Sequence, residues 1–141
     1  MSKYKVGIVG NGFVGESQAF AFSPTSKILI FDKDPIKSTN TLEEVLESDF
    51  VFVCVPTPMK KDGSQDTEII EDFFKSAKKG PIYIIKSTVL PGTTKNLANL
   101  YHDLDIIFSP EFLTERTAKL DIITQTRIIL GGSKTLTSKV K

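Results

Sequence analysis

Short runs of consecutive apolar residues recur along the chain, separated by turns and by segments with helical spacing. Apolar runs without polar alternation are typical of strands buried on both faces, as in parallel sheets that are covered by helices. They predict six strands, at residues 5–9, 27–31, 50–55, 82–85, 106–108 and 128–130. Because strands and helical segments alternate, we expect an α/β fold with a doubly wound, mainly parallel sheet of about six strands and helices on both faces.

The clearest helical pattern runs from Glu68 to Lys79. Its apolar residues recur on one side, its acids lie near the start, its lysines lie near the end, and Gly80 is placed to terminate it. Weaker patterns predict helices at residues 13–22, 41–47 and 93–101. Residues 60–66 are polar and contain a glycine, so we expect a loop there.

The length and composition predict a single globular domain. A chain of 141 residues fits one hydrophobic core, and 40% apolar with 25% charged residues is ordinary for such a domain. We assign residues 1–132 to this domain. Residues 133–141 have little apolar content, so we assign them to a tail or to the start of a linker helix toward a second domain.

Charge and hydropathy narrow the possible partners and the compartment. The net charge of +1 gives no broad field for nucleic acid or an anionic membrane, and no apolar run approaches the roughly 20 residues that cross a bilayer. The first apolar stretch is too short for a signal peptide, and a single cysteine cannot form an intramolecular disulfide. We therefore expect a cytoplasmic protein without nucleic-acid or membrane partners, and we assign no metal site.

A glycine-rich turn joins the first predicted strand to the first predicted helix. It has the spacing G-x-G-x-x-G and consists of Gly10, Asn11, Gly12, Phe13, Val14 and Gly15. The first N–H groups of a helix lack intrahelical partners and attract phosphate oxygens, so such a turn suits a pyrophosphate. Asp32 ends the next strand about 20 residues later, where an acid accepts the ribose 2′-hydroxyl of NAD and repels the 2′-phosphate of NADP. The pattern predicts a Rossmann-type domain that binds NAD.

Three further segments each follow a predicted strand, where open α/β sheets bind their ligands. They are residues 53–58 (VCVPTP), 87–94 (STVLPGTT) and 109–115 (SPEFLTE). Together with the glycine turn, and in this order, they resemble the UDP-glucose and GDP-mannose dehydrogenase family over nearly the whole chain. The resemblance implies the NAD-binding domain of a nucleotide-sugar 6-dehydrogenase. Such an enzyme oxidises the primary alcohol of a sugar nucleotide, here UDP-glucose foremost, to a carboxylate with two NAD.

The resemblance also implies roles for individual residues. It places the glycine turn on the pyrophosphate, with Asp32 and Lys37 near the adenosine ribose. It implies further NAD contacts for Val55, Pro56, Thr57, Thr88 and Glu115, and contacts with the nucleotide sugar for Glu111, Phe112, Leu113, Thr114 and Glu115. Thr88 and Glu115 match the threonine and glutamate that position water for hydrolysis, so both are candidate catalytic residues.

Part of the family's machinery is not found in this chain. The family forms a covalent adduct on a cysteine of a second domain, whereas Cys54 falls in a predicted strand. We interpret it as a small buried hydrophobe with a high-pKa thiol. The family's catalytic lysine and asparagine, and the helix through which it forms homodimers, are implied to lie beyond residue 141. The isolated chain is therefore expected to be inactive.

The sequence departs from the family pattern in places, and alternatives stay open. Glu16 replaces an apolar residue, Thr114 a frequent basic one, and only residues 37–40 are left to form the third strand. The turn is compatible with FAD or S-adenosylmethionine, and β-hydroxyacid and 6-phosphogluconate dehydrogenases share it without the Pro-Glu-Phe-Leu segment. A non-catalytic NAD-binding or interaction module would keep the fold without the chemistry. Singly, Thr57 could end a strand, Thr93 could cap a helix, and Glu111 or Glu115 could be first-turn helix acids.

Overall fold

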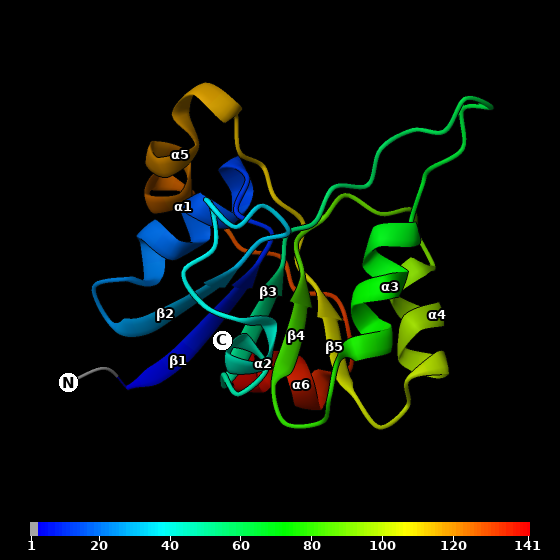
Figure 1. The fold of residues 1–141 in the computed structure, drawn as a ribbon. Coiled ribbons are helices and arrows are strands. Elements are labelled where there is room, and N and C mark those ends of the chain that lie inside the picture. The colour runs from blue at the N-terminus through cyan, green and yellow to red at the C-terminus, as the bar shows by residue number, and fades with distance from the viewer. Residues whose placement is uncertain (1–2) are drawn as a thin grey trace.

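The sheet of the computed structural model, which describes residues 3–141, is entirely parallel. Its five strands are β1 (Tyr4–Val9), β2 (Ser26–Phe31), β3 (Phe50–Val53), β4 (Ile82–Ile85) and β5 (Asp105–Phe108). They lie in the order β2-β1-β3-β4-β5, and every neighbouring pair is parallel. The chain adds β2 on one side of β1 and β3 on the other, so the strand order reverses there (Figure 1). The predicted parallel α/β sheet is confirmed.

The predicted sixth strand at residues 128–130 is wrong. Only the next residue reaches the sheet, because Gly131 forms an isolated antiparallel bridge with Phe108, with N–O distances of 2.7 and 2.8 Å. Ile128 and Ile129 are 68% and 45% exposed, so this apolar run is not buried between layers. An apolar run favours pairing with a neighbouring strand, but here the chain meets only the last residue of β5 and then continues into a helix at Lys134–Val140.

Residues 37–40, the expected remnant of a third strand, form no strand either. The amides of Thr39 and Asn40 both donate to the carbonyl of Ile30 in β2. Two amides that converge on one carbonyl cannot continue as a ladder, since a ladder needs successive partners along the strand. This segment therefore follows the edge of β2 without extending the sheet.

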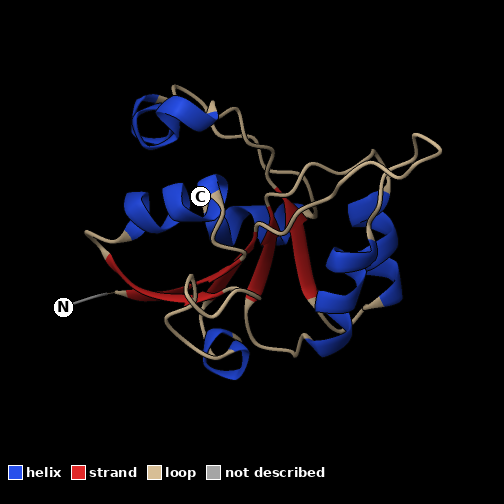
Figure 2. Cartoon of the chain, turned by 45° about the horizontal axis from the view of Figure 1, so that its top comes forward, coloured by secondary structure: helices blue, strands red, loops and turns tan. Residues whose placement is uncertain are grey.

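Helices cover both faces of the sheet, which confirms the doubly wound arrangement (Figure 2). Their bounds are α1 (Phe13–Phe22), α2 (Leu42–Val45), α3 (Glu68–Ser76), α4 (Thr93–Leu100), α5 (Ala118–Thr124) and α6 (Lys134–Val140), with a 3-10 helix η1 at Glu115–Thr117. Side chains of α2, α3 and α4 form one hydrophobic cluster with the sheet, and side chains of α1 and α6 form the other. The α5 helix packs on α1.

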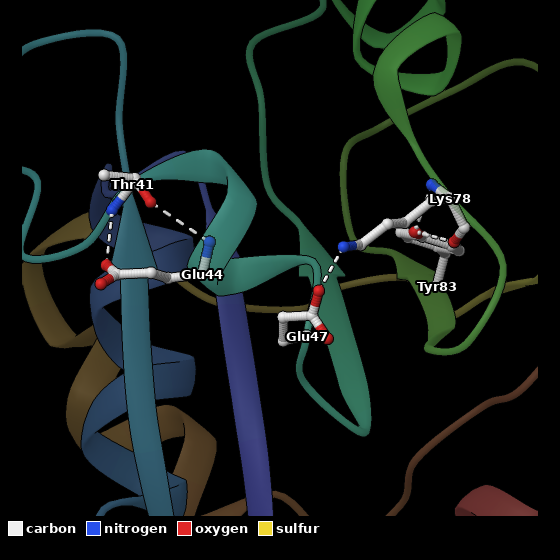
Figure 3. Close-up of polar contacts among 5 residues, drawn as sticks. All are labelled: Thr41, Glu44, Glu47, Lys78 and Tyr83. Carbon is white, nitrogen blue, oxygen red and sulfur yellow. Dashed lines mark hydrogen bonds and ion pairs between the residues drawn. The ribbon is translucent and has the colours of Figure 1, made fainter.

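The α3 helix ends three residues before the predicted end at Lys79. Its predicted apolar side is buried through Ile70, Phe73 and Phe74, but Ala77 is already extended, with ψ at 145°. The reason is Tyr83, a fully buried residue of β4 whose hydroxyl donates to the Lys78 carbonyl at 2.6 Å and accepts from the Lys78 amide at 3.1 Å (Figure 3). A tertiary contact, and not Gly80, therefore terminates the helix.

The α2 helix is a single turn within the predicted 41–47 range, and a capping box fixes its start. The Thr41 hydroxyl accepts from the Glu44 amide at 3.2 Å, and the Glu44 carboxylate accepts from the Thr41 amide at 2.9 Å (Figure 3). The backbone hydrogen bond from Thr41 is the main reason that the pKa of Glu44 is lowered. Nearby, Glu47 pairs with Lys78, which ties this region to the end of α3.

The last residues fold back onto the sheet. Ser133 accepts a hydrogen bond from the amide of Leu136 and so caps α6, and Leu136 and Val140 pack against the cluster on the α1 face. Residues 60–66 form the expected loop, which projects from the body of the domain between β3 and α3 (Figure 1). Within residues 3–141, no helix is long and apolar enough to cross a membrane.

Candidate functional site

The carboxyl ends of the strands form one edge, because the strands finish in register. Val9 pairs with Phe31 and Val53, Val53 pairs with Ile85, and Ile85 pairs with Phe108. The residues that follow are therefore neighbours along this edge: Gly10, Asp32, Cys54, Lys86 and Ser109. Ligands of open α/β sheets bind at this edge, at the point where the strand order reverses.

The glycine turn lies at that point, between β1 and β3. Gly10 has a φ of 91°, and a Cβ there would lie 2.7 Å from the carbonyl oxygen of Cys54, so only glycine fits beside the end of β3. A Cβ at Gly15 would lie 2.0 Å from the Gly10 carbonyl oxygen, which explains how closely α1 packs on the turn. At Gly12, by contrast, a Cβ would meet nothing within 4 Å.

The N-terminus of α1 is open toward this space. Gly12 is the N-cap, and among the described residues no side chain caps it. The first amides of the helix, at Phe13 and Val14, are thus free of side-chain acceptors, while the helix dipole favours negative charge there. The predicted placement of the turn is what an approaching pyrophosphate requires.

Asp32 is held against the turn from the end of β2. Its carboxylate accepts from the Asn11 amide at 2.7 Å and from the Asp34 amide at 2.8 Å. The Asn11 side chain in turn donates to the Lys37 carbonyl at 3.0 Å, whereas the Lys37 side chain is exposed. A carboxylate has about four acceptor positions, so Asp32 can still accept a ribose hydroxyl. The structure brings together these three residues, which the sequence separates by 26 positions.

The segments after β3 and β4 meet through Thr57 and Thr88. The Thr57 hydroxyl donates to the Thr88 carbonyl at 2.6 Å, and the buried Ser87 hydroxyl donates to the Val55 carbonyl at 2.7 Å. Gln65, which sequence reasoning missed, donates to the Thr88 carbonyl at 2.8 Å and accepts from the Leu90 amide at 3.2 Å. Pro56 and the Thr88 side chain are exposed beside these contacts.

A buried ion pair occupies the edge at β4 and β5. The Lys86 ammonium contacts the Glu111 carboxylate and donates to the Ser109 hydroxyl at 3.1 Å. The side chains of Lys86 and Glu111 are 6% and 8% exposed. Sequence analysis proposed Glu111 as a substrate contact but missed Lys86. The position of Lys86, directly after an apolar strand and at the ligand-binding edge, could have indicated its role.

The rest of the 111–115 segment leads away from that pair. Phe112 is exposed, and the guanidinium of Arg127 lies 5.7 Å from its ring centroid. Leu113 is half-buried, and the Thr114 amide donates to Asp121 at 2.9 Å. Glu115 is exposed at the start of η1, and within residues 3–141 no hydrogen bond or ion pair joins it to Thr88. The structure thus separates the buried Glu111 from the exposed Glu115.

Cys54 is the first residue after β3, because the strand ends at Val53, two residues before its predicted end. It packs against the cluster on the α1 face, and burial raises its pKa to about 12. The thiol is protonated at neutral pH, which agrees with the predicted high-pKa thiol and not with an activated nucleophile, while the residue itself is partly and not fully buried. His102 is exposed in the turn after α4.

Comparison with known sequences decides the family. The UDP-glucose/GDP-mannose dehydrogenase family, NAD binding domain, matches residues 35–141, which is more than half of the chain. The chain belongs to this family. The match confirms the resemblance and NAD as the cofactor, while the glycine turn and Asp32 precede the matched residues.

Curated relatives with known activity support this family assignment. The chain is 31% identical to the UDP-glucose 6-dehydrogenase of Campylobacter jejuni over 94% of its own length and 42% of that enzyme. It is 30% identical to the GDP-mannose 6-dehydrogenase of Pseudomonas putida over 67% of its length and 25% of that enzyme. It therefore spans less than half of these curated relatives.

Solved structures show the same fold at lower identity. A UDP-glucose dehydrogenase from Pyrobaculum islandicum superposes with a TM-score of 0.81 at 22% identity, over 97% of this chain and 43% of that one. A 3-hydroxyisobutyrate dehydrogenase from Mycobacterium tuberculosis gives a TM-score of 0.76 at 14% identity, over 100% of this chain and 50% of that one. The fold is thus shared with that dehydrogenase as well, whereas the family match is to the UDP-glucose/GDP-mannose dehydrogenase family.

Proposed function

We propose that this chain is the NAD-binding part of a nucleotide-sugar 6-dehydrogenase that acts on UDP-glucose. The observation that carries the proposal is the arrangement at one sheet edge: an uncapped helix start behind an open Gly12, with Asp32 held beside it. The family match and the UDP-glucose 6-dehydrogenases among the relatives support the substrate class.

NAD supplies a hydride acceptor for the alcohol carbon of the sugar, and the residues of this chain bind and orient it. The amides at the start of α1 hold the pyrophosphate, and Asp32 accepts a ribose hydroxyl, with Lys37 nearby. Val55, Pro56, Thr57 and Thr88 border the cofactor further along the edge, where two hydroxyl hydrogen bonds fix the loops after β3 and β4.

The sugar nucleotide lies against the 111–115 segment in this proposal. Glu111 and Phe112 line its path, and the exposed Glu115 is free to contact both ligands and to position water together with Thr88. Cys54 is not assigned the aldehyde adduct that this family forms on a cysteine, since burial keeps its thiol protonated. A cytoplasmic location and a homodimer formed outside this chain stay predictions.

Two titrations and one turnover assay test the proposal. The chain is titrated calorimetrically with NAD and with NADP, and we expect NAD to bind more tightly because the Asp32 carboxylate repels a 2′-phosphate. The complete protein is then assayed for NADH formation from UDP-glucose and from GDP-mannose. A chain that binds neither cofactor contradicts the proposal. NAD binding without turnover of either sugar nucleotide would instead favour a non-catalytic NAD-binding module.

A further inference from the structure

The Lys86–Glu111 pair is unusual because both charges are removed from water. Lys86 follows β4, Glu111 follows β5, and both side chains are more than nine-tenths buried. Moving two charges into the interior is costly, and an ion pair there is often no more stable than apolar residues of similar volume. Stability of the fold therefore gives no sufficient reason for this pair.

The hydrogen bonding of the pair is also incomplete. Lys86 has two partners, the Glu111 Oε1 atom and the Ser109 hydroxyl at 3.1 Å. The Glu111 Oε2 atom is buried and has no hydrogen-bond partner in the described part of the chain. Buried polar atoms are nearly always paired, so an unpaired carboxylate oxygen at a ligand-binding edge indicates an acceptor reserved for a donor that arrives with a ligand.

We propose that Lys86 is a positioning residue that fixes Glu111 so that its Oε2 atom accepts a hydrogen bond from a hydroxyl of the substrate. This inference rests on the proposed function. Lys86 engages Oε1, and the Ser109 hydroxyl, directly after β5, accepts a hydrogen bond from the ammonium. Because the pair is neutral as a whole, the site suits an uncharged hydroxyl donor better than an anionic group. Lys86 does not itself touch the substrate.

An exposed ion pair on α3 provides a contrast. Lys75 and Asp72 form this pair at 2.9 Å, with both side chains more than half exposed. An exposed pair contributes little and is screened by water and salt. Lys75→Met thus removes a lysine from an ion pair outside the glycine turn and the segments that follow the strands, and it serves as the matched control for changes at Lys86.

The test uses the complete protein with the variants K86M, K86R, E111Q and K86M/E111Q. Steady-state kinetics with UDP-glucose and NAD are measured together with thermal unfolding. We expect K86M to lower kcat/KM for UDP-glucose by about 30-fold or more, because a buried carboxylate loses its charged partner. The KM for NAD should stay within about twofold, K86R should recover most of the loss, and K75M should change neither constant.

The double variant keeps the test decisive even if K86M folds poorly, since it removes both buried charges. K86M/E111Q should match E111Q in kcat/KM, because Lys86 has nothing to position once the carboxylate is gone. The inference is overturned if K86M leaves kcat/KM unchanged, if the double variant falls well below E111Q, or if NAD binding weakens as much as sugar turnover. A wild-type protein that binds no NAD or oxidises no sugar nucleotide overturns the proposed function, and this inference with it.

Discussion

Alanine at Gly12 should mainly weaken NAD binding, whereas alanine at Gly15 should mainly lower the stability of the fold. A methyl group at Gly12 meets no atom within 4 Å, and the φ of −80° is open to any residue, so the fold should lose only about 0.5–1 kcal/mol for a poorer N-cap. A methyl group at Gly15 would lie 2.0 Å from the Gly10 carbonyl oxygen. Backbone must then move, at a cost of about 1–3 kcal/mol or more.

Gly12→Ala, which should cost the fold little stability, should weaken NAD binding strongly. At Gly12 the methyl group projects into the space through which the pyrophosphate approaches, so at least one amide–phosphate hydrogen bond is lost. A hydrogen bond to a charged group contributes about 1.5–3 kcal/mol, which corresponds to roughly 10- to 150-fold weaker binding. Urea unfolding and calorimetric titration with NAD measure the two effects. A Gly12→Ala variant that binds NAD like the wild type would refute the placement of the pyrophosphate.

Asp32→Ala should weaken NAD binding by about 1–3 kcal/mol in calorimetry. Asp34→Ala, which changes an exposed acid two residues away, should leave NAD binding unchanged. Equal NAD affinities of the wild type and both variants would show that Asp32 is not part of the site. The pKa of Glu44 is lowered from its ordinary value of 4.5. Its charged carboxylate therefore stabilises the fold at pH values above 4.5, and this contribution is lost as the pH falls through the lower pKa of the folded state. The stability difference between wild type and E44A should therefore shrink with acid, and a difference that grows would be inconsistent with the capping box. The thiol of Cys54, with a pKa of about 12, should react with iodoacetamide at neutral pH far more slowly in the folded than in the urea-unfolded chain, and equal rates would contradict its burial.

The site elements that could be predicted from sequence are those with local causes. The glycine turn needs Gly15 because a side chain there would meet the Gly10 carbonyl of the same turn, and Asp32 is placed by the end of its own strand. Parallel strands that finish in register bring such strand-end residues to one edge, whatever the details of packing. The turn and Asp32 therefore followed from motif and strand order, whereas Thr57 and Thr88 were expected as separate NAD contacts and their hydrogen bond was not predicted.

The elements that could not be predicted depend on contacts that form only when the strands and helices are already packed together. The run at 128–130 is as apolar as a strand, yet only Gly131 meets the sheet, because pairing depends on where the chain crosses β5. The end of α3 is set by Tyr83 in the following strand. Lys86 and Glu111 lie 25 positions apart, and nothing in either local sequence indicates that their charges meet in the interior.

The location of NAD at the carboxyl edge is tested most directly by amide chemical shifts of the chain during an NAD titration. We predict that the amides of Asn11, Phe13 and Val14 shift most, while those of Lys27 and Ile82, at the opposite ends of their strands, stay in place. Shifts that gather at the opposite edge, or a turn that stays unchanged while NAD binds, would contradict the account.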